Sequence, residues 1–190
     1  MSQTTPAVPP QGQAPAGQPP LVVNVQYVKD LSFEVPGAPQ IYQRLRSQPQ
    51  VGINLDVQVR KLQEPGAYEV GLVIRAEARE APAQGAPVAA DAGLAVFIAE
   101  ITYAGVFTLT GIPENAVEPV LLVECPRLLF PYARNILGEI TREGGFPPVL
   151  LQPVDFVALW NARRAQAAQG GGAPTPQGGQ ATIPAGAALA

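Results

Sequence analysis

The chain has few of the side chains on which most catalytic and metal sites depend. It contains no histidine and one cysteine, and 14% of its 190 residues are charged. Zinc sites, histidine general bases and Cys-His nucleophiles are therefore excluded, and we expect neither a cofactor nor an enzymatic activity. Cys125 stands between Glu124 and Pro126, with no histidine to activate it. We expect this thiol to pack as a small apolar side chain.

Long apolar runs and an excess of positive charge are also missing. The longest apolar stretches, such as residues 94–99, fall far short of the roughly eighteen residues that a membrane-spanning helix needs. The N-terminus lacks the basic and then hydrophobic pattern of a secretory signal. The net charge of -3 provides no general surface for nucleic acid. These features predict a cytoplasmic protein that neither inserts into a membrane nor binds nucleic acid.

Charge is absent altogether from both ends of the chain. Residues 1–20 and 165–190 carry no charged side chain and are rich in proline, glycine and alanine. Such segments cannot bury enough apolar surface to offset the entropy of ordering. The sequence predicts a disordered N-terminal tail at 1–20, one domain at 21–164 and a disordered C-terminal tail at 165–190.

Four segments of the central region alternate between apolar and polar residues, as strands do. They cover residues 22–35, 51–60, 68–79 and 94–109. The fourth segment is apolar on both faces, which indicates a central strand or a strand at a subunit contact. In the first segment, strict alternation predicts one face made of Val23, Val25, Tyr27, Leu31, Phe33 and Val35.

After Gly111 the apolar residues recur at helical spacing. A first short helix through VEPVLLVEC is predicted to be interrupted at Pro126, and a longer one to end at Gly144. A last helix begins near Pro153, with Asp155 in its first turn. Strands followed by helices predict an α+β fold, in which a four-stranded antiparallel sheet carries its helices on one face.

Two groups of residues are candidates for function on residue chemistry alone. Asp30, Glu34 and Glu100 form the best available acid/base set, but a solvated strand face is the favoured interpretation. The crossover FPPVLLQP at 146–153 is apolar yet broken by prolines. It could form a groove for an extended hydrophobic peptide or an ordinary lid over the core, and its composition favours neither.

Several segments together resemble the SecB family of protein-export chaperones. They are YVKDLSFEVPGAPQ at 27–40, AGVFTLTGI at 104–112, CPRLLFPYAR at 125–134 and GGFPPVLLQPVDFVALW at 144–160. They occur in the family's order and approximate spacing, and with the strands between them they cover essentially all of 21–164. This combination is far more specific than any single short motif.

The resemblance implies a function, partners and sites. It implies a homotetramer, a dimer of dimers, that acts as an ATP-independent holdase, captures unfolded precursor proteins and passes them to the SecA motor ATPase. The implied SecA-binding residues are Asp30, Glu34, Ile98 and Glu100. The implied client-binding residues are Val51, Ile53, Leu55, Phe146, Val149, Leu151 and Trp160. The implied oligomer contacts are Ala99, Ile101 and Tyr103, together with the long helix after Pro126.

Two other functions remain open at this point. A SecB-like chaperone dedicated to one partner, such as an antitoxin, would share the fold and the groove but not the motor-binding face. A small-molecule-binding or hydrolytic domain would need Asp30, Glu34 and Glu100 gathered in one cavity away from solvent.

Overall fold

The computed structural model describes residues 19–45, 47–80, 94–169 and 181–183. Residues 1–18 of the predicted N-terminal tail, the predicted loop at 81–93 and most of the predicted C-terminal tail lie outside these ranges.

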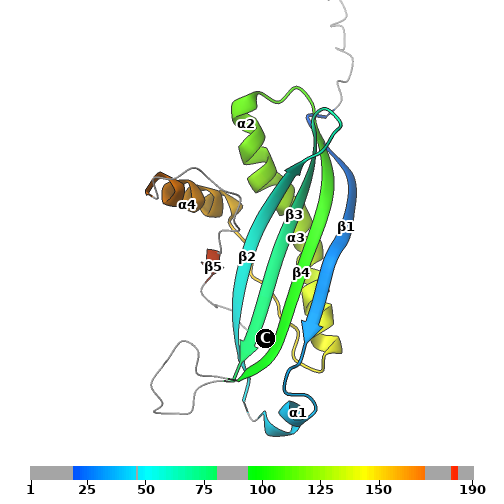
Figure 1. The fold of residues 1–190 in the computed structure, drawn as a ribbon, viewed down its shortest axis with the longest axis vertical. Coiled ribbons are helices and arrows are strands. Elements are labelled where there is room, and N and C mark those ends of the chain that lie inside the picture. The colour runs from blue at the N-terminus through cyan, green and yellow to red at the C-terminus, as the bar shows by residue number, and fades with distance from the viewer. Residues whose placement is uncertain (1–18, 46, 81–93, 170–180, 184–190) are drawn as a thin grey trace, which may run out of the picture.

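The four predicted strands form one antiparallel sheet (Figure 1). The strands are β1 (Leu21–Glu34), β2 (Gln50–Lys61), β3 (Ala67–Arg79) and β4 (Ala95–Leu109), arranged in the order β1-β4-β3-β2. A short helix, α1 (Gln40–Arg44), lies between β1 and β2 in the chain, and a three-residue strand, β5 (Ala181–Ile183), pairs with the outer edge of β2. Because β4 pairs with both β1 and β3, its apolar character is explained by a central position within one chain.

Strand β1 does not follow the strict alternation that its sequence predicts. Its pairing with β4 shifts register between Val23 and Val25 and again between Val28 and Asp30. Each shift inserts one extra residue, and such a bulge moves the following side chains to the other face. Tyr27 therefore lies on the face opposite to Leu31, so the predicted single face for the odd-numbered residues is wrong.

The helical region after Gly111 is more continuous than its prolines indicate. The helices α2 (Glu114–Pro119) and α3 (Cys125–Glu143) are joined without a break by a π-helical turn, η1 (Val120–Glu124). Pro126 lies in the first turn of α3, directly after η1, and its fixed φ suits the first turn of an α-helix. The predicted interruption at Pro126 is therefore wrong, because this proline begins a helix instead of ending one.

The last helix, α4 (Phe156–Gln169), starts beside Asp155. The carboxylate oxygen Oδ1 of Asp155 accepts a hydrogen bond of 3.0 Å from the backbone N–H of Ala158, so Asp155 caps the helix and does not lie in its first turn. Helix α4 and strand β5 extend into the predicted C-terminal tail, and the predicted domain end at 164 is therefore too early. Among the described residues, no helix has the length and apolar character needed to cross a membrane.

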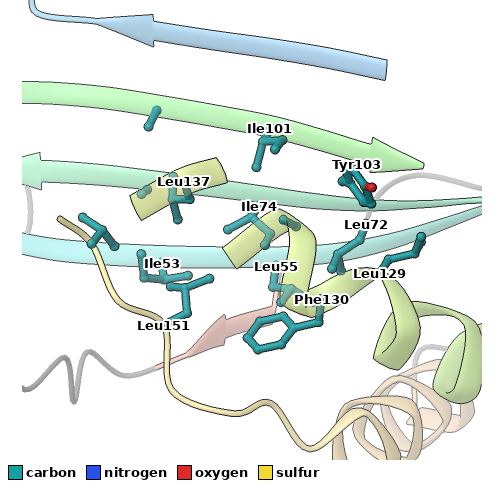
Figure 2. Packing of buried hydrophobic residues seen from close by; sticks show 14 of the residues in the cluster. Ile53, Leu55, Leu72, Ile74, Ile101, Tyr103, Leu129, Phe130, Leu137 and Leu151 are labelled. Carbon is teal, nitrogen blue, oxygen red and sulfur yellow. The ribbon is translucent and has the colours of Figure 1, made fainter. Parts of the chain in front are cut away.

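Helix α3 covers one face of the sheet and forms the core with it (Figure 1). Leu129 and Leu137 of α3 and Leu72 and Ile74 of β3 are all fully buried in this layer (Figure 2). The sheet face away from α3 is called the open face below. The predicted α+β class, with a four-stranded antiparallel sheet and helices on one face, is confirmed.

Candidate functional site

The four residues implied in motor binding lie together on the open face. Glu34 of β1 is the register partner of Ile98 of β4, and Glu100 pairs with Ser32, two residues from both Asp30 and Glu34. Asp30 and Glu34 are exposed, and the Glu100 side chain is 37% exposed. We call Asp30, Glu34, Ile98 and Glu100 the acidic patch.

The border of the acidic patch on β3 carries cations that the sequence analysis did not place there. The guanidinium of Arg75 lies 3.1 Å from a Glu100 carboxylate oxygen and 3.4 Å from Glu77. Arg79 lies 2.6 Å from the same Glu77. The patch is therefore acidic on β1 and largely neutralised toward β3.

This arrangement does not resemble a catalytic carboxylate site. Asp30 and Glu34 face solvent, and Glu100 is paired with Arg75, so the three acids are not enclosed in one cavity. Across the described part of the chain, no group of three or more His, Cys, Asp and Glu side chains could hold a metal ion. The favoured interpretation of a solvated strand face agrees with this geometry.

A buried carboxylate that the sequence analysis missed lies near the other end of the open face. Glu69 of β3 is 5% exposed and accepts hydrogen bonds from Tyr27, from Lys29 at 2.9 Å and from Arg60 at 3.0 Å. The Tyr27 hydrogen bond, helped by Lys29 and Arg60 and opposed by burial, lowers the pKa of Glu69 below its ordinary value of 4.5. The bulges of β1 place Tyr27 on this face. The alternation of apolar and polar residues along the sequence does not reveal a bulge, so this contact could not be predicted from it.

The implied client residues divide into three groups in the structure. Leu55 of β2 and Trp160 of α4 meet in one apolar pocket between β2, η1 and α4. Its lining residues are Leu55, Val57, Leu122, Phe156, Leu159, Trp160 and Arg163. Arg163 closes one side of this client pocket, because it is ion-paired with Asp56 and donates a hydrogen bond of 3.3 Å to the Val57 carbonyl.

The second group, Ile53, Val149 and Leu151, belongs to the covered core. Val149 and Leu151 are 3% and 7% exposed, and Leu151 lies beside Ile53 of β2 (Figure 2). Thr141 of α3 fixes the crossover, since its hydroxyl accepts a hydrogen bond of 3.0 Å from the backbone N–H of Val149. In this conformation the crossover is a lid over the core, which was one of the two interpretations left open.

The third group, Phe146 and Val51, lies away from the client pocket. Phe146 packs among aromatic rings beneath the opposite end of the sheet, with its ring centroid 5.0 Å from that of Phe97 and 5.3 Å from that of Tyr42. Val51 is partly buried against the core and pairs with Ala78. Neither residue lines the client pocket.

The three strand residues implied in oligomer contacts are already buried within a single chain. Ala99 and Ile101 are fully buried and Tyr103 is 8% exposed, because α3 packs over this face of β4. The expectation that these three side chains face another protomer is corrected by this placement. Apolar side chains are exposed instead on the β1 edge and on the outer side of α3, namely Val23, Val25, Val28 and Leu31 and, on α3, Leu128 and Tyr132.

Cys125 is fully buried at the start of α3. Burial, with a smaller contribution from the neighbouring Glu124, raises the pKa of this thiol to about 12. The thiol is therefore protonated at physiological pH and packs as the sequence predicts.

Comparison with known proteins agrees with this architecture. A family model described as preprotein translocase subunit SecB matches residues 14–167. The protein-export protein SecB of Granulibacter bethesdensis is 69% identical over 156 residues, which cover 82% of this chain and 88% of that protein. The protein of the same name from Acidiphilium cryptum is 67% identical over 150 residues, covering 77% of this chain and 90% of the relative.

One solved structure shares the fold at low sequence identity. It is a SecB-like chaperone of Mycobacterium tuberculosis in complex with a peptide from an antitoxin. The TM-score is 0.53 at 16% identity, and the match covers 70% of this chain and 90% of the other.

Proposed function

The chain belongs to the SecB family of protein-export chaperones, and we propose that it is an ATP-independent holdase that binds unfolded precursor proteins in the cytoplasm and delivers them to SecA. In this proposal the protein has no catalytic step of its own. It acts by keeping apolar segments of a client out of water until the motor takes them.

The client pocket is the observation that carries this proposal. Leu55 lies on β2, whose outer edge is paired at residues 53–55 with the three-residue strand β5, and Trp160 lies on the adjacent helix α4. A strand edge offers backbone hydrogen bonds to an extended chain, and the neighbouring pocket offers an apolar surface for one of its side chains. A folded protein has already buried both kinds of group, so this arrangement favours unfolded clients.

A substitution at Trp160 tests the client pocket. Trp160→Ser should weaken binding of reduced, carboxamidomethylated α-lactalbumin, which cannot refold, by about 10-fold or more, because buried tryptophans are common hot spots. Val157→Ser is the matched control, since Val157 lies on the same helix, is 42% exposed and does not line the pocket. Dissociation constants from fluorescence anisotropy provide the measurement, and light scattering provides the assembly state of each variant.

Equal affinity of the wild type and Trp160→Ser would place the client site elsewhere. Leu55 is less suitable for this test because it is 2% exposed in the core, and a polar residue there would destabilise the fold itself.

Delivery to SecA is assigned to the acidic patch. Its exposed carboxylates and its apolar Ile98 lie on the open face, away from the client pocket, so motor and client could bind together. The carboxylates on β1 suit a basic partner surface, and this association should weaken as salt rises.

Assembly is assigned to the exposed apolar side chains of the β1 edge and α3. An edge strand with unpaired backbone groups and apolar side chains is typical of a sheet that continues into a second copy. We propose that two copies pair in this way and that α3 brings two such dimers into a tetramer.

A chaperone dedicated to one antitoxin is the weaker alternative. The structural neighbour bound to an antitoxin peptide is 16% identical to this chain, and that likeness concerns the fold alone. The relatives that are 67–69% identical are named protein-export proteins, which favours the general export function.

A further inference from the structure

A segment from the C-terminal end of the chain pairs with the outer edge of β2. Strand β5 runs antiparallel to β2, with Ile183 opposite Ile53, Thr182 opposite Asn54 and Ala181 opposite Leu55. Figure 1 shows β5 in red beside β2, on the edge of the sheet that is farthest from β1.

This pairing uses part of the proposed client site. Leu55 lines the client pocket, and Ile53 is two residues away on the same strand. An edge strand can add one extended chain at a given position, because each backbone N–H and C=O on that edge pairs with one neighbour. A client strand and β5 cannot both occupy the edge at residues 53–55.

We propose that residues 181–183 are an internal competitor that occupies the β2 edge until an unfolded client displaces it. This inference rests on the proposed client function. It assigns to the uncharged C-terminal segment a regulatory role, that of weakening the binding of poor clients.

The sequence of the segment suits a weak and displaceable strand. Thr182 and Ile183 are the only adjacent β-branched residues in 165–190, and such residues favour strands. Pro184 follows at once and has no N–H to donate, so pairing cannot extend as a regular ladder beyond Ile183. Three paired residues give a small and reversible contact.

The connection to α4 keeps this segment close to its binding edge. Eleven residues separate Gln169 at the end of α4 from Ala181, which allows a reach of at most about 40 Å. Helix α4 is itself anchored to β2 through Arg163 and Asp56. A connection of this length gives an effective concentration of about 1 mM. If the isolated segment bound with a Kd of about 0.1–1 mM, it would weaken client binding by about 2- to 10-fold.

Two changes remove the competitor without altering the folded domain. One is a chain ending at Gly179, and the other is Thr182→Pro, which removes a backbone donor from the paired residues. Gln177→Pro is the matched control, because it makes the same change outside the paired residues. Binding of reduced, carboxamidomethylated α-lactalbumin gives the affinity, and hydrogen exchange of residues 52–56 reports the pairing of the edge.

Both changes should tighten client binding by about 2- to 10-fold and speed amide exchange at 52–56, whereas Gln177→Pro should match the wild type. A synthetic peptide of residues 176–188, added at millimolar concentration to the shortened chain, should reverse the gain in affinity. Unchanged exchange would show that β5 does not pair in solution, and faster exchange with unchanged affinity would show pairing without competition. Either result overturns the inference and leaves the proposed function intact, whereas failure of every form, wild type included, to bind the probe overturns both.

Discussion

Arg163 of α4 reaches across the edge of the sheet to form an ion pair with Asp56 of β2. It also donates a hydrogen bond to the Val57 carbonyl, and it lines the client pocket. The position of α4, and with it the position of Trp160, therefore depends in part on a polar contact at the edge of an otherwise apolar pocket.

Arg163→Gln should loosen α4 from β2. The Asp56 side chain is 16% exposed, and loss of a charged partner at a half-buried site typically costs about 1–2 kcal/mol. Amide exchange within α4 should become faster by about 5- to 30-fold, measured by mass spectrometry. Arg127→Gln is the control, because Arg127 contacts Glu124 on the surface; equal exchange in the two variants would contradict this role for Arg163.

The acidic patch should be required for SecA association and not for client binding. Glu34→Lys combined with Glu100→Lys should abolish co-sedimentation with SecA, because it reverses the charge beside Ile98 and places a second cation near Arg75. Suppression of client aggregation should persist. The control, Glu64→Lys with Glu114→Lys, makes the same charge change at two exposed positions outside the acidic patch and outside β1 and α3. Loss of holdase activity with retained SecA binding would contradict this assignment and would place client binding on the acidic patch.

Assembly should depend on exposed side chains of β1 and α3. Leu31→Lys and Leu128→Lys each place a charge at an apolar position that is 41% exposed in the single chain, and a charge buried without a partner at an interface costs several kcal/mol. The mass measured by light scattering should fall from about four chains to two or one. Val59→Lys, on the opposite edge strand and 40% exposed, should leave the mass unchanged. If it alone lowered the mass, the interface would lie on β2.

Glu69 should make folding stability depend on acid pH. Its pKa is lowered in the folded chain, so its stabilisation is present above about pH 4.5 and is lost as the pH falls through the folded value. Glu69→Gln should cost about 1–2 kcal/mol at pH 7 and flatten the stability profile below pH 4.5, measured by urea unfolding. Glu64→Gln, in the exposed turn before β3, should follow the wild-type profile.

Local sequence patterns were enough to predict the four strands, their alternation in β2 and the class of the fold. Each of these features depends on neighbours along the chain, such as the alternate apolar positions from Val51 to Val59 that share one face of β2. The family resemblance was also readable from local segments. The acidic patch could be anticipated because Ile98 and Glu100 share one face of β4, while Asp30 and Glu34 share one face of β1 beyond its second bulge.

Only the tertiary structure decided which residues meet across the sheet. The two bulges of β1 bring Tyr27 to Glu69, the central position of β4 buries Ala99 and Ile101 under α3, and the π-helical turn lets Pro126 begin a helix. The pairing of β5 with β2 joins residues more than 120 positions apart. These outcomes depend on register and on competition between distant segments for the same backbone groups, whereas periodicity along the chain records only which face a residue prefers.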